Sequence, residues 1–233
     1  MRDDPHPRIT PPRRDGDLVR APARSAGIAV ALFAVVALLA IVVATDPVAP
    51  RFLQGLDDAW RRTVLAWPDR TRRLGEALEQ IGAGVVMVPL RIVVAAWLAL
   101  RRRRWDLAAW LLGWAAADAL TWVLKPGLAR ERPTATDARN PFTSFPSAHA
   151  KTAAQVAVGL VLVATSPWVA RWRWYALAAA WTALMALSRT VVDHHWLSDV
   201  VAGSLLGTAA ALLAAAGVQL LRERDRQPAA APP

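Results

Sequence analysis

The stretch SRTVVDHHWLSD, residues 188–199, follows an apolar run and places one Arg, two His and two Asp within twelve residues. If the chain is helical from Val191 onward, His195 and Asp199 share a helix face because they are four residues apart. A carboxylate in that position holds one imidazole nitrogen as the N–H donor and leaves the other as a directed lone pair. Arg189, six residues before His195, can supply a fixed cation at the same point. The stretch therefore indicates a nucleophilic or basic histidine at the end of an apolar helix.

Two earlier polar stretches also adjoin apolar runs: KPGLARERP at residues 125–133 and PSAH at residues 146–149. We expect each of them at a membrane boundary. Lysine occurs only at Lys125 and Lys151, in or beside these stretches, although arginine is frequent. This choice indicates a specific need for a compact ammonium group.

The composition is that of a membrane protein. Hydrophobic residues make up 55% of the 233 residues, and several windows of roughly 20 residues carry almost no charge. The net charge of +10 comes mostly from arginines at the ends of apolar runs, which favours membrane orientation over nucleic-acid binding. The absence of cysteine excludes a disulfide framework and a thiolate metal site.

The apolar runs predict an all-α bundle of six transmembrane helices within residues 26–221. The expected spans are residues 26–44, 81–100, 105–124 and 149–164, a fifth that ends at residue 187, and residues 200–221. Residues 1–25 and 222–233 are expected to be disordered cytoplasmic tails. The first span could instead be a secretory signal, but its long apolar core and poor cleavage pattern favour an uncleaved helix.

The segment at about residues 46–80 is predicted to contain an amphipathic helix. Its apolar positions are Leu53, Leu56, Trp60, Val64 and Trp67, opposite Asp57, Asp58, Arg61 and Arg62. Such a helix either lies in the bilayer interface or caps the bundle, and the sequence favours neither.

Charged residues inside and between the spans predict pairing and topology. Arg91 needs a partner in the membrane, and Asp118 in the next span is the candidate. The four arginines at 101–104 should stay cytoplasmic, which places both termini inside and the three polar stretches on the external face. Gly203 and Gly207 predict close helix packing in the last span.

Together the three stretches suit phosphoryl transfer. Lys125, Arg132 and Arg189 can neutralise phosphate oxygens, and the amides after Ser147 add a helix N-terminus that favours an anion. Of the two imidazoles, at His149 and His195, one can attack phosphorus while the other protonates the departing oxygen.

These residues resemble the three motifs KxxxxxxRP, PSGH and SRxxxxxHxxxD of the type 2 phosphatidic acid phosphatase, or lipid phosphate phosphatase, superfamily. Order and spacing match, and the resemblance covers residues 26–221. It implies that His195 forms a phosphohistidine, Asp199 orients it, and His149 is the general acid. By the same resemblance, no metal or other cofactor is needed, and the substrates are phosphatidic acid, phosphatidylglycerol phosphate or polyprenyl mono- or diphosphates. The resemblance also implies that the phosphate is bound by Lys125, Arg132, Ser147, Ala148 and Arg189.

Two positions leave questions open. Ala148 replaces the motif glycine, which strains the loop if that position needs positive φ but is mild if only close approach to phosphate is required. His194 adjoins His195, and the spacing from Arg189 and to Asp199 selects His195.

The sequence therefore predicts a lipid phosphate phosphatase at the outer face of a bacterial inner membrane. Competing interpretations are a vanadium-dependent haloperoxidase, a phosphate or headgroup transferase, and a lipid-phosphate binding or transport protein without turnover.

A metal site at His194, His195 and Asp199 lacks a further suitable ligand. Lys151 and Gln155 either extend the polar lining of the site or pack inward.

Overall fold

The structure is a computed structural model that describes residues 18–19, 21–45, 52–82, 84–134, 144–165 and 171–226. These residues form helices and no strand, so the all-α prediction is confirmed for this part of the chain. The helices are α1 (Pro22–Thr45), α2 (Phe52–Leu65), α3 (Asp69–Gly82), α4 (Gly84–Leu100), α5 (Arg104–Leu128), α6 (Ala148–Ala164), α7 (Trp172–Val191) and α8 (Leu197–Arg226).

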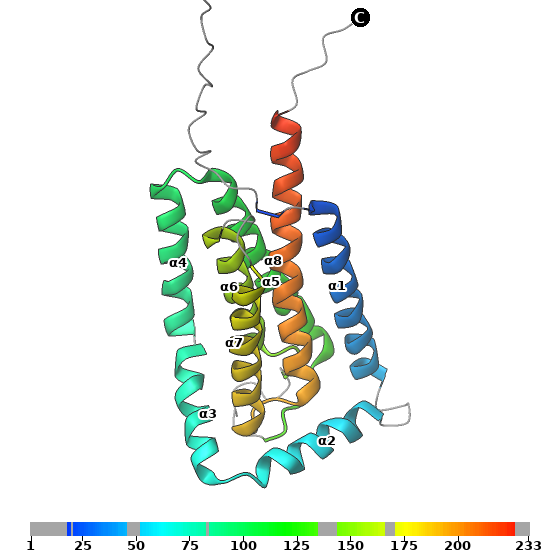
Figure 1. Ribbon diagram of the computed structural model, residues 1–233. Coiled ribbons are helices and arrows are strands. Elements are labelled where there is room, and N and C mark those ends of the chain that lie inside the picture. Colours follow the sequence, from blue (N-terminus) through cyan, green and yellow to red (C-terminus); the bar gives the residue numbers. More distant parts are fainter. Residues whose placement is uncertain are drawn as a thin grey trace, which may run out of the picture.

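The long helix α8 is the centre of the bundle, with α1, α5 and α6 packed around it and α7 packed on α6 and α3 (Figure 1). Its contact with α6 depends on the two glycines of the predicted packing face. A Cβ at Gly203 would lie 2.4 Å from the carbonyl oxygen of Ser147, and one at Gly207 would lie 2.1 Å from that of Lys151. The two backbones therefore touch, which confirms the predicted close packing.

Three helices, α1, α5 and α8, are long and apolar enough to cross a membrane, and the bent pair α3 and α4 would make a fourth. Helix α6 is apolar but has 17 residues, fewer than the roughly 20 that a span usually needs. The described residues thus form a membrane protein with three or four such helices, and the predicted count of six is not established.

Several predicted boundaries differ from the structure. Helix α5 continues past Lys125 to Leu128, and α7 continues to Val191. The helix expected from Val191 through Asp199 does not form, because residues 192–196 make a turn before α8 begins. Asp193 has a φ of 61°, a left-handed conformation that Asp tolerates better than most residues. This residue reverses the chain at the end of α7.

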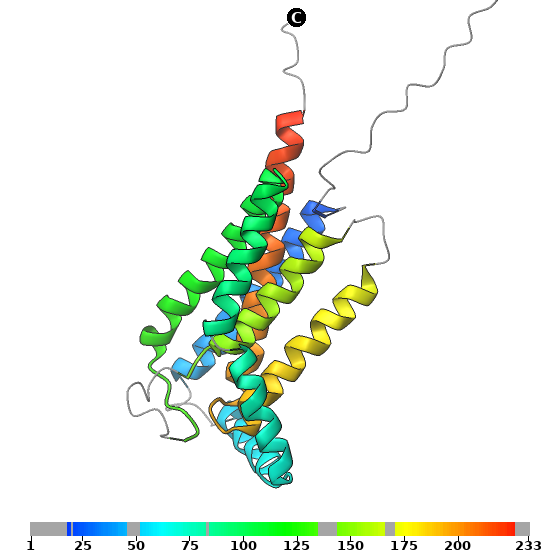
Figure 2. The same cartoon turned by 90° about the vertical axis from the view of Figure 1, so that its left-hand side faces the viewer.

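The amphipathic segment forms two helices, α2 and α3, that meet at an elbow at one end of the bundle (Figures 1 and 2). The face of α2 that packs on the protein is mixed: Asp57 and Val64 are 1% and 2% exposed, whereas Leu56 is 49% exposed. The structure agrees with the interpretation that α2 caps the bundle.

The predicted partner of Arg91 is confirmed. Its guanidinium forms an ion pair of 3.1 Å with Asp118, and the ammonium group of Lys151 binds the same carboxylate. Lys151 and Gln155 are both buried in α6. Their inward packing agrees with the second interpretation of these two residues.

The elbow of α2 and α3, the turn between α7 and α8 and the start of α6 lie at one end of the bundle (Figure 1). The turn at Arg101–Arg103, the start of α1 and the end of α8 lie at the other. Near that second end, the backbone of Leu18 binds Gln219 through its amide and Arg171 through its carbonyl oxygen.

Candidate active site

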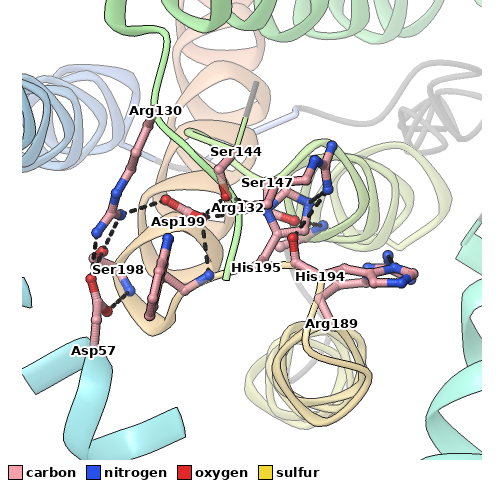
Figure 3. A network of polar contacts seen from close by, with 12 residues as sticks. Asp57, Arg130, Arg132, Ser144, Ser147, Arg189, His194, His195, Ser198 and Asp199 are labelled. Carbon is pink, nitrogen blue, oxygen red and sulfur yellow. Dashed lines mark hydrogen bonds and ion pairs between the residues drawn. The ribbon is translucent and has the colours of Figure 1, made fainter. Parts of the chain in front are cut away.

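His195 and Asp199 meet at the beginning of α8. The Nδ1 atom of His195 lies 3.4 Å from Oδ2 of Asp199, and both side chains are buried (Figure 3). The same oxygen accepts hydrogen bonds from the hydroxyl of Ser144 at 2.5 Å and the amide of Trp196 at 3.0 Å. Since His195 precedes α8, the pair forms across the first turn of this helix and not along a continuous one.

The other nitrogen of His195 faces a cation. Nη1 of Arg132 lies 3.5 Å from Nε2 of His195 and donates a hydrogen bond of 3.1 Å to the carbonyl oxygen of His194. Lys125, in the last turn of α5, interacts electrostatically with both Arg132 and Asp199. A histidine held by a carboxylate on one side and facing cations on the other can attack an anionic centre.

The second motif joins the third through the backbone. Ser147 is the N-cap of α6, and its own amide donates a hydrogen bond of 3.0 Å to the carbonyl oxygen of Asp199. Ala148 is the first helical residue and is not among the residues with positive φ, so the structure gives no sign of backbone strain from its replacement of glycine. His149 follows, with its Nε2 buried and without a hydrogen-bond partner among the described residues.

Arg189, near the end of α7, is almost completely buried beside His194 and Glu79. Its Nη2 lies 2.7 Å from Nδ1 of His194, and its Nη1 lies 3.1 Å from the carboxylate of Glu79 on α3. The side chain of His194 is 29% exposed and that of His195 only 3%. The two histidines therefore face different partners.

Arg130 links Asp199 to α2. Its Nη1 donates to Oδ1 of Asp199 at 2.6 Å and to the hydroxyl of Ser198 at 2.7 Å, and its Nη2 donates to Asp57 at 2.7 Å (Figure 3). Asp57 also accepts hydrogen bonds from the amide of Ser198 at 2.8 Å and from its hydroxyl at 2.6 Å.

The structure thus brings all eight residues predicted for the site to one end of the bundle. Sequence reasoning missed Asp57, Glu79, Arg130 and Ser144. Arg130 lies inside the first motif and Ser144 lies three residues before Ser147, so their positions could have suggested them. Asp57 and Glu79 carry no such signal, because they lie on α2 and α3, far from the motifs in sequence.

Burial lowers the pKa of His195 to about 4, because it removes water from around the cationic form of the imidazole. The neighbouring Asp199 opposes this effect only in part, and the positive charges of Arg132 and Lys125 lower the pKa further. Burial, followed by the charge of Arg189, also lowers the pKa of His194. His195 is therefore neutral at pH 7, the form in which a histidine acts as a nucleophile. Among the described residues, no group of three or more His, Cys, Asp or Glu side chains is placed to hold a metal ion.

The sequence profile of the PAP2 superfamily, the type 2 phosphatidic acid phosphatases, matches residues 106–223. This range contains all three motifs. The chain belongs to the PAP2 superfamily. Outside the matched range lie α1 to α4, and with them Asp57 and Glu79.

Known relatives agree with this assignment. Phosphatidylglycerophosphatase B of Bacillus subtilis (strain 168) is 28% identical over 184 residues, which cover 76% of this chain and 88% of that protein. The crystal structure of a transmembrane PAP2 type phosphatidylglycerolphosphate phosphatase from Bacillus subtilis superimposes with a TM-score of 0.68 at 26% identity, covering 85% of this chain and 98% of that one. The crystal structure of Aquifex aeolicus LpxE shares the fold, with a TM-score of 0.54 at 20% identity. That superposition covers 67% of this PAP2 protein and 92% of the LpxE chain.

Proposed function

We propose that this PAP2 protein is an integral membrane phosphatase that hydrolyses a lipid phosphate through a phosphohistidine at His195. The observation that carries the proposal is the position of His195 between Asp199 and Arg132, at 3.4 Å and 3.5 Å from its two ring nitrogens. One nitrogen is held by a carboxylate, and the other faces a cation that an anionic substrate would contact.

In the first step, Nε2 of His195 attacks phosphorus and the P–O bond to the lipid breaks. Arg132, Lys125, Arg189 and the N-terminus of α6 at Ser147 and Ala148 would hold the phosphate oxygens. The buried Nε of Arg132 and Nε of Arg189 have no hydrogen-bond partner among the described residues, which supports this assignment. His149, whose Nε2 also lacks a partner, would enter this step as the imidazolium and give its proton to the departing oxygen.

In the second step, water attacks the phosphohistidine and the P–N bond breaks. His149, now neutral, would take the proton from this water, and phosphate would leave with His195 restored. His149 would thus begin and end the cycle as the imidazolium, and the proton transfers balance. No metal ion and no other cofactor is assigned a role.

The names of the relatives make phosphatidylglycerol phosphate a candidate substrate, beside phosphatidic acid and polyprenyl mono- or diphosphates. An apolar groove of about 640 Å³ between α4, α6 and α7 would take the hydrocarbon chain. Two of its residues, Val156 and Leu160, lie on the helix face of α6 that begins with His149, the proposed proton donor to the departing lipid. The leaving group would therefore depart toward this groove.

A second apolar groove, of about 650 Å³, lies between α7 and α8. It is lined by Leu197, Val201 and Ser204, on the side of α8 opposite Asp199, so it is less suited to the substrate. Both grooves present apolar side chains to the bilayer, and their different positions allow them to be tested against each other.

The proposed topology has six membrane helices, with both termini and Arg101–Arg104 in the cytoplasm of a bacterium and the site at the external face of the inner membrane. The location of the site at the end of the bundle opposite these arginines supports it (Figure 1). In this arrangement residues 26–221 form the membrane domain between two cytoplasmic tails.

The test is phosphate release by the purified protein in detergent, with a chelator present. Substrates are phosphatidylglycerol phosphate, phosphatidic acid, undecaprenyl diphosphate and a soluble phosphomonoester, each with His195→Ala and His194→Ala. We expect release from a lipid that survives the chelator, falls by at least about a thousandfold in His195→Ala and by less than about tenfold in His194→Ala. Full activity of His195→Ala would contradict the proposal.

A further inference from the structure

The carboxylate that faces His195 is shared with a cation. Oδ1 of Asp199 accepts a hydrogen bond of 2.6 Å from Arg130, while Oδ2 faces His195 and its other donors. Asp199 is completely buried, and a buried carboxylate requires such a partner. Taken alone, however, a pair of Arg130 and Asp199 has no net charge.

A second carboxylate restores the negative charge. Asp57 on α2 is 1% exposed and binds the other end of the same guanidinium at 2.7 Å. Two carboxylates around one guanidinium leave the trio with a net charge of −1 (Figure 3). The trio is fixed further by Ser198, which donates its amide and its hydroxyl to Asp57 and accepts from Arg130.

We propose that Asp57 and Arg130 are positioning residues for the phosphatase reaction: Arg130 fixes the orientation of Asp199, and Asp57 offsets the charge of Arg130 so that Asp199 still stabilises a positive charge on His195. The inference rests on the proposed function, in which His195 is the nucleophile. As Nε2 bonds to phosphorus, the imidazole ring acquires positive charge, and its Nδ1–H points at Asp199. A trio with a net charge of −1 lowers the energy of this state, whereas a neutral pair would do so far less.

The three-motif pattern does not contain Asp57, which lies outside the residues that match the family profile. Its helix α2 therefore contributes to the site by charge as well as by covering it. The consequence is that the amphipathic segment is part of the catalytic arrangement.

The test is a double-mutant cycle on the full chain, with kcat and KM measured on the preferred lipid. Asp57→Asn makes the trio neutral, and we expect kcat to fall about tenfold while KM changes less than about threefold. Arg130→Gln leaves two buried carboxylates in proximity and should lose more. In the double variant Asp57→Asn with Arg130→Gln, the net charge returns to −1, so its kcat should exceed the product of the two single effects by at least about tenfold.

The matched control is Arg61→Gln. Arg61 also joins α2 to the turn before α8, through hydrogen bonds of 2.8 Å and 2.7 Å to Asp193, but neither residue contacts Asp199. We expect kcat within about twofold of the unchanged protein, because this pair docks α2 without altering the charge at Asp199.

Three results would overturn the inference: unchanged kcat in Asp57→Asn, equal losses in Arg61→Gln and Asp57→Asn, or single effects that simply multiply in the double variant. If Arg130→Gln does not fold, as judged by gel filtration and thermal unfolding, Asp57→Asn and Arg61→Gln still decide between charge and docking. Failure of the unchanged protein to hydrolyse any lipid phosphate would instead refute the proposed function.

Discussion

Gly207 of α8 lies directly against the backbone of Lys151 in α6, and a Cβ at this glycine would be 2.1 Å from the carbonyl oxygen of Lys151. This contact, with that of Gly203 against Ser147, sets the distance between the two helices that carry the second and third motifs. It is therefore a structural requirement for the hydrogen bond between the amide of Ser147 and the carbonyl oxygen of Asp199.

We expect Gly207→Ala to destabilise the protein by about 1–3 kcal/mol, because the added methyl group must push α6 and α8 apart. The control is Gly217→Ala in the same helix, where a Cβ meets nothing within 4 Å and alanine favours the helix. Thermal unfolding in detergent should show a lower Tm for Gly207→Ala and an unchanged or higher Tm for Gly217→Ala. Equal Tm values would contradict the close packing described for these helices.

The hydroxyl of Ser144 supports Asp199. Because it donates a hydrogen bond of 2.5 Å to the same oxygen that faces His195, Ser144→Ala should loosen the carboxylate and reduce kcat by about three- to tenfold. Ser204→Ala serves as the control, since that hydroxyl donates only to the carbonyl oxygen of Val200 within α8. Steady-state kinetics on one lipid substrate would distinguish them, and identical rates would remove Ser144 from the site.

The pH dependence should reflect the lowered pKa of His195. The reactive form is neutral, and burial lowers its pKa to about 4, so protonation of His195 should not reduce kcat/KM until the pH falls close to 4. An acid limb due to His195 near pH 6.5, the value of an ordinary histidine, would contradict the buried geometry.

The same shift affects stability. In the unfolded chain His195 takes up its proton near pH 6.5, before the folded protein does, so stability should decline as the pH falls from about 6.5 to 4, by up to about 1.4 kcal/mol per pH unit. Below pH 4 both states are protonated and this contribution no longer changes. His195→Gln should reduce the slope in a comparison of Tm against pH.

A tryptophan placed in one or the other apolar groove should affect the KM for a lipid phosphate differently. Ala157→Trp would fill the groove below His149 and should raise KM for a long-chain lipid phosphate about tenfold, with little effect on a chainless phosphomonoester. Ala183→Trp, which fills the groove between α7 and α8, should leave the KM for both substrates within about twofold of that of the unchanged protein. The reverse outcome would assign the hydrocarbon chain to the second groove.

Local spacing was sufficient to predict much of the site. The residues of each motif lie within twelve positions of one another, and apolar runs position those motifs at helix ends, so Lys125, Ser147, His149, Arg189, His195 and Asp199 were identifiable as candidates. Periodicity and length also predicted an all-α membrane protein, because a polar backbone in a bilayer must bond within its own helix. The pairing of Arg91 with Asp118 followed from the cost of an isolated charge in the same environment.

The tertiary structure decided how these residues are held. The turn at residues 192–196 replaces the expected helix, because the chain reverses at Asp193 before α8 begins, and His195 still reaches Asp199 across that turn. On α3, Glu79 pairs with Arg189. The direction of α2 depends on which charges find partners: Asp57 is buried because Arg130 and Ser198 lie opposite it. These partners are 73 to 141 residues away from Asp57 along the chain, a separation that helix periodicity cannot bridge. The sequence alone therefore determined the chemistry of the motifs, whereas only the folded bundle determined which carboxylates balance their cations.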